Sequence, residues 1–404
     1  MQKRKVCEVL VACLLAVAVL LAQTPTGGIE GTVTDATGAV LPGATVTITN
    51  AGNGQVFNLK TSDAGLYSQQ NLDPGTYNVR IEASGFQQTE IRNVTVLTGS
   101  VANGSVSLKV GSSATTVEVA GQAEAVDTAR QTVDTVITTT EIKNLPLFGR
   151  NFLDLASLAP GTVVRDGGAI DPTKSNTYRT VGIAGRSGTA TRVQVDGIDI
   201  TDETVGTTVA NLSQDAVSEF QVSRSSLDLS TSLTSSGAVN IISKTGTNQL
   251  HGTGFFDYTN NDLSARQNYN TVVPDSSRKR YGVGAGGPVI KDKLFVYGNL
   301  EKSNQLQGQI VNNPTFPQYS ATASLPLTYQ YAIGSLDYNI TPSMRAFYRF
   351  LHSDDLSTGG SPISPYQNVD WTNTHILGLT FGSAHLTHNL RFGYTKFHNH
   401  IDSS

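Results

Sequence analysis

Four blocks of sequence decide the fold of this chain: LPLFGRNFLDLASLAPGT (145–162), AGRSGTATRVQVDGIDITD (184–202), DAVSEFQV (215–222) and SSGAVNIISKTGTNQLHGTGFF (235–256). The first predicts a short amphipathic helix over Arg150–Leu158. The second alternates apolar residues and then reverses at Asp196-Gly197, as two strands joined by a turn do. The last predicts a strand over Gly237–Ser243. The blocks together indicate short strands and helices followed by the start of an all-strand region.

Length and composition bound the class of protein. With 404 residues the chain is long enough for two or three domains. Its net charge is −4 and it has no basic block, which excludes a typical nucleic-acid binder. Abundant glycine, threonine and serine with only 15% charged residues favour many short strands joined by turns.

The first 22 residues predict a secretory signal. A basic stretch at 3–5 precedes an apolar run at 9–21, and Ala22 is a plausible cleavage edge. The apolar run is too short for a bilayer span of ~20 residues. Leu10–Cys13 also fits a lipoprotein box, which leaves that alternative open.

Both cysteines of the chain, Cys7 and Cys13, lie inside this signal. We therefore expect a mature protein without disulfides, thiolate metal sites or a cysteine nucleophile. No later segment has the length and apolarity of a transmembrane helix, so residence in a membrane would require a β-barrel.

Residues 23–110 predict a small β-sandwich of about seven short strands. Turn signals such as Leu41-Pro42-Gly43 and Asp73-Pro74-Gly75 separate strands with alternating apolar residues, for example Tyr77, Val79 and Ile81. Tyr67, Tyr77 and Phe86 could stack on a sugar ring, although packing in the core or in a turn is the simpler interpretation.

Residues 247–404 predict seven or eight strands of an antiparallel β-barrel. In the last strand Leu386, Leu390, Phe392 and Tyr394 share one parity, and Asn389 and Arg391 take the other, as expected for a lipid face and a wet lumen. Interface girdles are predicted from Tyr338, Phe347, Tyr348 and Tyr394.

The sequence motifs that could indicate cofactor binding or metal binding are not specific. Gly282, Gly284 and Gly287 satisfy a dinucleotide fingerprint, but Pro288 and a strand follow where a helix is required. The histidines near the end, including His398 and His400 on one strand face, are interpreted as dispersed strand residues. An acidic group in the second block fits no calcium loop and predicts a solvated turn: Asp196, Asp199, Asp202 and Glu203. We expect no cofactor, no metal, no catalytic residue and no enzyme activity.

The four blocks resemble the plug domain of TonB-dependent outer-membrane receptors, in particular the Oar-like branch, followed by the start of their barrel. GTVTDATGAVLPGATVTI (31–48) and the residues after it resemble the carboxypeptidase regulatory-like domain, a prealbumin-like sandwich classed with carbohydrate-binding-like folds. The resemblance implies a mainly β protein: signal 1–22, sandwich 23–110, linker 111–135, α+β plug 136–246 and the first barrel strands 247–404.

The resemblance also implies partners and site residues. A TonB box, the extended segment that pairs with TonB, matches Thr115, Thr116, Val117, Glu118, Val119, Ala120 and Gly121, although an ordinary linker strand fits equally well. Val195, Asp196 and Gly197 match the plug turn of the family. The implied partners are the TonB energy-coupling complex, outer-membrane lipid and an unidentified extracellular ligand, with no nucleic acid.

The implied function is energised uptake of a ligand, such as a glycan or a siderophore, across the bacterial outer membrane. Sandwich and linker would lie in the periplasm. A non-transport surface protein, acting in adhesion, secretion or display, is the alternative, and a secreted sugar-binding accessory is a third. Because a plug needs a wide lumen, as in 22-stranded transporters, we expect the sequence to be an incomplete chain; a closed eight-stranded barrel would have no room for the plug.

Overall fold

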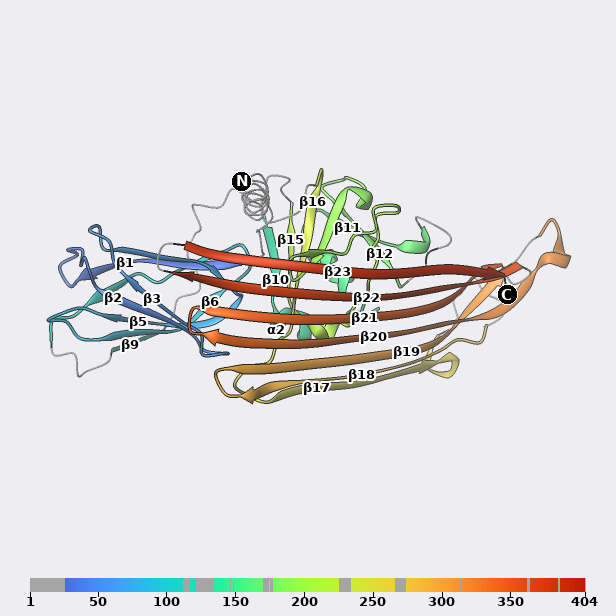
Figure 1. Cartoon of the computed structure of the whole chain (residues 1–404). Coiled ribbons are helices and arrows are strands. Elements are labelled where there is room, and N and C mark those ends of the chain that lie inside the picture. Colours follow the sequence, from blue (N-terminus) through green and yellow to red (C-terminus); the bar gives the residue numbers. More distant parts are fainter. Residues whose placement is uncertain are drawn as a thin grey trace, which may run out of the picture.

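The computed structural model describes residues 26–111, 117–120, 134–145, 147, 149–169, 174, 177–224, 234–265, 274–311, 314–361, 364–383 and 386–403. The predicted signal sequence lies outside these residues. Strands dominate the described part, and a sandwich, a mixed α+β unit and a sheet of long strands follow one another along the chain (Figure 1). None of the helices described is long and apolar enough to cross a membrane.

The N-terminal unit is a sandwich of two sheets. One sheet has the order β4-β1-β7, with β8 also on β1, and the other has the order β3-β2-β5-β6-β9. The strands are β1 (Gly27–Asp35), β2 (Thr45–Asn50), β3 (Val56–Lys60), β4 (Leu66–Leu72), β5 (Gly75–Glu82), β6 (Thr89–Val96), β7 (Val101–Asn103), β8 (Val106–Leu108) and β9 (Val117–Ala120).

Alternating burial explains why these residues form a sandwich. Val46 and Ile48 of β2 and Tyr77, Val79 and Ile81 of β5 are all fully buried, while the residues between them face outward. Short β7 and β8 both pair parallel with β1, one after the other. Counted as one interrupted strand they give the predicted seven strands before β9.

The second unit, called the plug here, is built on a five-stranded sheet of order β10-β15-β16-β13-β14 and a separate pair, β11-β12. Short helices connect the strands. The elements are β10 (Asp134–Ile137), α2 (Thr139–Asn144), η1 (Phe152–Leu158), β11 (Thr162–Asp166), η2 (Gly167–Ala169), β12 (Arg179–Ile183), η3 (Gly188–Ala190), β13 (Thr191–Val195), β14 (Ile198–Asp199), η4 (Gln214–Ala216), β15 (Val217–Ser223) and β16 (Gly237–Ser243).

The helices of the plug follow local sequence signals. Thr138 and Glu141 form a reciprocal capping box at the start of α2, and Leu145 is extended after its end. The predicted helix over 150–158 is a 3₁₀ helix, η1. It buries Phe152, Leu153 and Leu155 and leaves Leu158, at its last position, exposed.

The third unit is one antiparallel sheet of seven long strands in sequence order, β17 to β23. Among the described strands, β17 and β23 each pair with a single neighbour. The elements are β17 (His251–Asn260), η5 (Asn261–Leu263), β18 (Ser277–Ile290), β19 (Leu294–Val311), η6 (Pro317–Tyr319), β20 (Ala321–Thr341), β21 (Met344–Ser361), β22 (Ser364–Ser383) and β23 (Leu386–Ser403).

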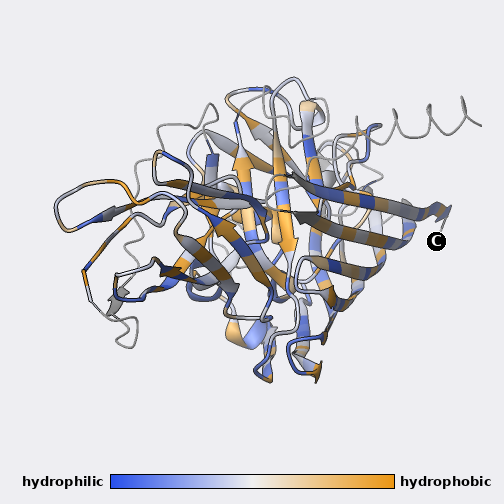
Figure 2. Ribbon diagram, turned by 60° about the vertical axis from the view of Figure 1, so that its left-hand side comes forward, coloured by the Kyte–Doolittle hydropathy of each residue, from blue (hydrophilic) through white to orange (hydrophobic). Residues whose placement is uncertain are grey.

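The two faces of this sheet have different chemistry, and Figure 2 shows apolar and polar residues alternating along the strands. Exposed apolar side chains lie on the outer face, among them Val283, Leu300, Leu336, Leu377, Leu390, Phe392 and Tyr394. Polar side chains buried on the inner face include Asn299, Glu301, Asp337, Arg349, Asp355, Asp370 and Asn389. The expected parity of β23 is confirmed for the residues whose side chains are described.

The inner face of the sheet packs on the plug. Tyr297, Ile333, Phe347, Leu351 and Ile376 belong to the same hydrophobic core as the plug strands. Phe347 is therefore an inner-face residue, and its predicted place in an interface girdle was wrong: it has the parity of Arg345 and Arg349. The plug is held by one wall of the barrel through contacts that are both apolar and polar.

The connections between the long strands differ at the two ends. At the end beside the sandwich, three residues join β18 to β19 and two residues join β20 to β21. At the opposite end, residues 261–276 join β17 to β18 and residues 312–320 join β19 to β20, while two residues join β21 to β22. In transmembrane barrels short turns face the periplasm and longer loops face the exterior.

The parity of β23 predicts which positions meet lipid. A bimane fluorophore attached to cysteine at Phe392 should be strongly quenched by nitroxide-labelled lipids in reconstituted vesicles, because this side chain points outward. The same label at Leu390 should behave alike, whereas a label at Asn389 should be protected. Equal quenching at Asn389 and Phe392 would contradict the assignment of the faces.

Candidate site where plug, barrel and sandwich meet

The predicted turn at Asp196-Gly197 joins β13 to β14. Asp196 has a φ of 48° and Gly197 a φ of 83°, so both residues are in the left-handed region. Two-residue hairpins favour this geometry, and aspartate and glycine are the residues that tolerate it best. The local sequence therefore positions the Asp196 side chain at the tip of a tight hairpin.

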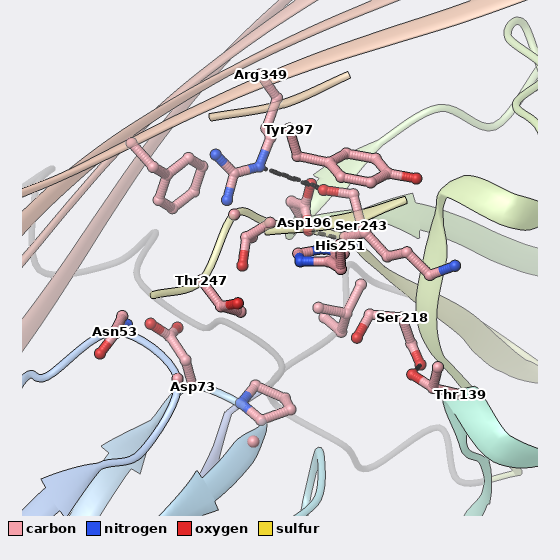
Figure 3. A pocket seen from close by; sticks show the side chains of 18 of the residues that line it. Asn53, Asp73, Thr139, Asp196, Ser218, Ser243, Thr247, His251, Tyr297 and Arg349 are labelled. Carbon is pink, nitrogen blue, oxygen red and sulfur yellow. Dashed lines mark hydrogen bonds and ion pairs between the residues drawn. The ribbon is translucent and has the colours of Figure 1, made fainter. Parts of the chain in front are cut away.

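Asp196 is buried, and its carboxylate is held by the end of β16. Its Oδ1 accepts a hydrogen bond from the backbone N–H of Ser243 at 3.0 Å, and its Oδ2 accepts one from the Ser243 hydroxyl at 2.6 Å. The Nε of Arg349, from barrel strand β21, lies 3.7 Å from Asp196 Oδ2 and donates to the Ser243 hydroxyl at 3.2 Å (Figure 3). The plug turn thus meets a buried arginine of the barrel wall.

A series of ion pairs connects Arg349 to the sandwich. Arg349 Nη2 lies 2.8 Å from Asp337 Oδ1, and Arg345 Nη2 lies 2.5 Å from the same oxygen. Arg345 also forms an ion pair with Asp73, in the sandwich turn between β4 and β5. A single chain of alternating charges therefore connects Asp196 of the plug, the barrel wall and the sandwich.

A cavity of about 410 Å³ lies along this chain of charges. Sandwich residues Asn53 and Asp73 line one side, plug residues Thr139 and Ser218 line another, and Arg349 closes it from the barrel (Figure 3). The guanidinium groups of Arg349 and Arg391 lie 4.5 and 4.3 Å from the centre of the Phe347 ring. The cavity is bounded by all three units, and its lining combines apolar surface with charged side chains such as Asp73 and Arg349.

A second plug–barrel contact centres on Arg150, whose role the sequence analysis missed. Its guanidinium lies 3.8 Å from the centre of the Phe255 ring and pairs with Asp215 at 2.7 Å. Beside it, the hydroxyl of Ser213 donates to Glu301 of the barrel at 2.6 Å. In the sequence, the one pointer to this contact was the FGR motif before η1. The periodicity of apolar residues does not show which partner an arginine will have.

The sandwich also contacts the plug directly. The backbone N–H and the hydroxyl of Thr98 donate to Glu219 Oε2 at 3.1 and 2.9 Å. Burial raises the pKa of Glu219 to about 6, and the two hydrogen bonds from Thr98 oppose this rise. Sequence reasoning did not anticipate this pair, which joins residues 121 positions apart.

The candidate TonB box is partly described. Val117–Ala120 form β9, which pairs parallel with β6 over four residue pairs, from Thr89–Val117 to Arg92–Ala120. Thr115, Thr116 and Gly121 lie outside the described residues. The segment is thus an edge strand with one described neighbour, at the rim of the sandwich.

The predicted solvated turn is wrong for Asp196, which is buried, whereas Glu203 is exposed. Arg192 pairs with Asp199 and Glu203, and Lys174 pairs with Asp202. No group of three or more histidine, cysteine or acidic residues in the described part is placed to hold a metal ion. His398 and His400 are neighbours on β23, His400 pairs with Asp402 at 3.0 Å, and His385 lies outside the described residues. Tyr67 and Tyr77 are buried in the sandwich.

Comparison with known proteins is consistent with this architecture. Residues 28–109 match the carboxypeptidase regulatory-like domain and residues 242–324 match an outer membrane beta barrel domain. The TonB-dependent transporter Oar of Myxococcus xanthus is 25% identical over 335 residues, which cover 78% of this chain and 29% of that protein. The chain therefore spans less than a third of the length of this relative.

Two solved structures share the fold. The outer membrane transporter YddB from Escherichia coli superposes with a TM-score of 0.55 at 12% identity, covering 66% of this chain and 39% of that one. The siderophore receptor PirA from Acinetobacter baumannii gives a TM-score of 0.51 at 20% identity, covering 66% and 40%. The predicted resemblance to TonB-dependent receptors is supported: the chain combines a carboxypeptidase regulatory-like domain with part of an outer membrane beta barrel domain, and its plug and barrel strands share the fold of these solved structures.

Proposed function

We propose that the chain acts in TonB-dependent, energised uptake of an external ligand across the outer membrane. The observation that carries this proposal is the plug turn at Asp196, which is fastened inside the barrel wall by Arg349. A plug held to the wall by a small set of ionic and apolar contacts blocks the lumen at rest and can still be displaced when work is done on it. The relatives compared above are transporters or receptors, which supports a non-enzymatic role.

The direction of transport follows from the ends of the barrel strands. Short turns lie beside the sandwich, so we place the sandwich and the linker in the periplasm and the longer connections outside. A ligand would bind from the side of the longer connections. TonB, driven by the proton gradient through its inner-membrane partners, would pull on the periplasmic segment and displace the plug. A glycan and a siderophore are two classes of ligand that this route would suit.

The position of β9 supports a role as the TonB box. Strand addition needs an extended segment whose backbone can form hydrogen bonds with the edge of a partner sheet. β9 has one described neighbour and four residue pairs, so few backbone hydrogen bonds must break to free it. We therefore assign Thr115–Gly121 as the contact with TonB.

A surface protein anchored by its barrel, for adhesion, secretion or display, is the second candidate. Its support is the sandwich, a domain that could present a binding surface. The two candidates differ in β9, because a static anchor has no need for a segment that detaches and binds TonB.

Substitution within β9 tests the assignment of the TonB box. Val119→Pro removes a backbone N–H and restricts φ, so the affinity of the full chain for the purified periplasmic domain of TonB should fall by about tenfold or more. Glu118→Ala is the matched control and should change the affinity by less than about threefold, because strand addition relies on the backbone. Isothermal titration calorimetry measures both. Unchanged affinity of Val119→Pro would favour the anchor function.

Removal of the charge at Asp196 tests whether its ion pair with Arg349, called the lock here, holds the plug in place. Asp196→Asn leaves Arg349 without a carboxylate partner in the plug, which should cost about 3 kcal/mol and raise amide exchange in β13 about a hundredfold. Asp199→Asn, in the same hairpin but partly exposed, should cost less than about 0.5 kcal/mol. Hydrogen exchange with mass spectrometry compares the two, and similar exchange in both variants would refute the lock.

A further inference from the structure

The sandwich has no assigned task, yet three separate contacts fix it to the rest of the molecule. Its Leu97–Ser100 loop contacts the plug, its 51–54 turn contacts the barrel turns, and Asp73 pairs with Arg345 of the barrel. A domain attached only by a linker would need none of these contacts. The positions of these three contacts, on the plug and on the barrel, indicate a mechanical role for the sandwich.

The plug contact lies on β15, beside β10, which is the first plug strand after the linker. Beyond the Thr98–Glu219 pair, Gly99 has a φ of 68°, and a Cβ at this position would lie 2.7 Å from Gln221 Nε2. Gln221 in turn donates to Asp134 of β10 at 3.2 Å. The sandwich loop therefore covers the pairing of β10 with β15.

β10 is the first strand of the plug after the linker. It pairs with β15 over only four residues, Asp134–Ile137, and lies at the edge of the plug sheet. A pull on the linker would reach β10 before any other described plug strand. The loop at Leu97–Ser100 thus lies over the place where the plug would begin to open.

The barrel contact anchors the sandwich from the other side. Asn248, in the connection to β17, donates its backbone N–H to Gly52 O at 2.8 Å, and its side chain donates to Asp292 Oδ1 at 2.7 Å. Asn339 Nδ2 donates to Asn53 O at 2.9 Å and to Asp292 O at 3.0 Å. The sandwich turn is thereby held against the β18–β19 turn and the adjoining end of β20, together called the barrel turns here.

We propose that the sandwich is a brace: anchored on the barrel turns, it holds β10 against β15 and keeps the plug closed until the sandwich is pulled away. This inference deepens the proposed function, on which its biological meaning rests. β6 carries β9 on its edge and leads directly into the Leu97–Ser100 loop. A partner that pulls on β9 would therefore apply force to the sandwich and to β10 at the same time.

Loss of the Thr98 hydroxyl tests the contact. Thr98→Val keeps the shape but removes one hydrogen bond to a buried carboxylate, so the amides of 134–137 should exchange about tenfold faster or more in the full chain. Thr95→Val, on the exposed face of β6, is the matched control and should leave the exchange unchanged. Equal exchange in Thr98→Val and Thr95→Val would overturn the proposal.

A reversible cross-link tests the brace without weakening the plug contact. A Cβ at Gly54 would lie 3.2 Å from the Cβ of Asp292, close to the ~3.5–4.5 Å of a disulfide. In a chain with Gly54→Cys and Asp292→Cys, and with Cys7 and Cys13 replaced by serine, oxidation should slow exchange of 134–137 by about tenfold relative to the reduced form.

Because both forms share one sequence, the strain at Gly54, whose φ is 72°, cancels in this comparison. Identical exchange in the oxidised and reduced forms, with the disulfide verified by mass, would overturn the brace. Neither measurement requires TonB or a ligand. Failure of the brace would therefore leave the TonB affinity measured with Val119→Pro intact, and failure of TonB binding would leave the exchange results intact.

Discussion

The burial of arginine side chains in the barrel wall is the constraint on which this structure depends. Arg345 and Arg349 are almost completely removed from solvent. A guanidinium cannot lose its proton under ordinary conditions, so each buried arginine needs carboxylates and hydrogen-bond acceptors nearby. Asp337 supplies one from the barrel itself, and Asp196 and Asp73 supply the others from the plug and the sandwich. Charge balance in the wall therefore depends on both of the other units being in place.

This dependence explains how a plug can be stable and displaceable. Most of its core is its own, but the contact with the wall combines a few apolar side chains, such as Phe347 and Ile376, with ionic pairs and hydroxyl groups. In water, ionic contacts are screened within about 8 Å at physiological ionic strength. Once the turn at Asp196 moves, water can solvate both partners, and the lock does not act over the rest of the path. A wall of continuous apolar packing would resist the whole displacement.

Prediction from sequence succeeded where a local pattern determines the structure. The turn at Asp196-Gly197, the strand at Gly237–Ser243 and the outward face of Phe392 follow from turn chemistry and alternation. Prediction from sequence failed for contacts between segments that are far apart in the chain. Glu219 with Thr98 and Arg345 with Asp73 join residues of different units, and no periodicity reports such pairs. Phe347 was misplaced because an aromatic residue alone does not reveal its face; the neighbouring arginines at 345 and 349 did.

Force applied through β9 tests the central claim most directly. The full chain, held by its barrel in a supported bilayer, can be pulled by a TonB periplasmic domain attached to an optical trap. The account predicts that the sandwich leaves the barrel turns first, that β10 and then the rest of the plug follow at higher force, and that β17 to β23 stay paired. A record in which TonB detaches without any extension, or in which the barrel sheet yields before the plug, would contradict it.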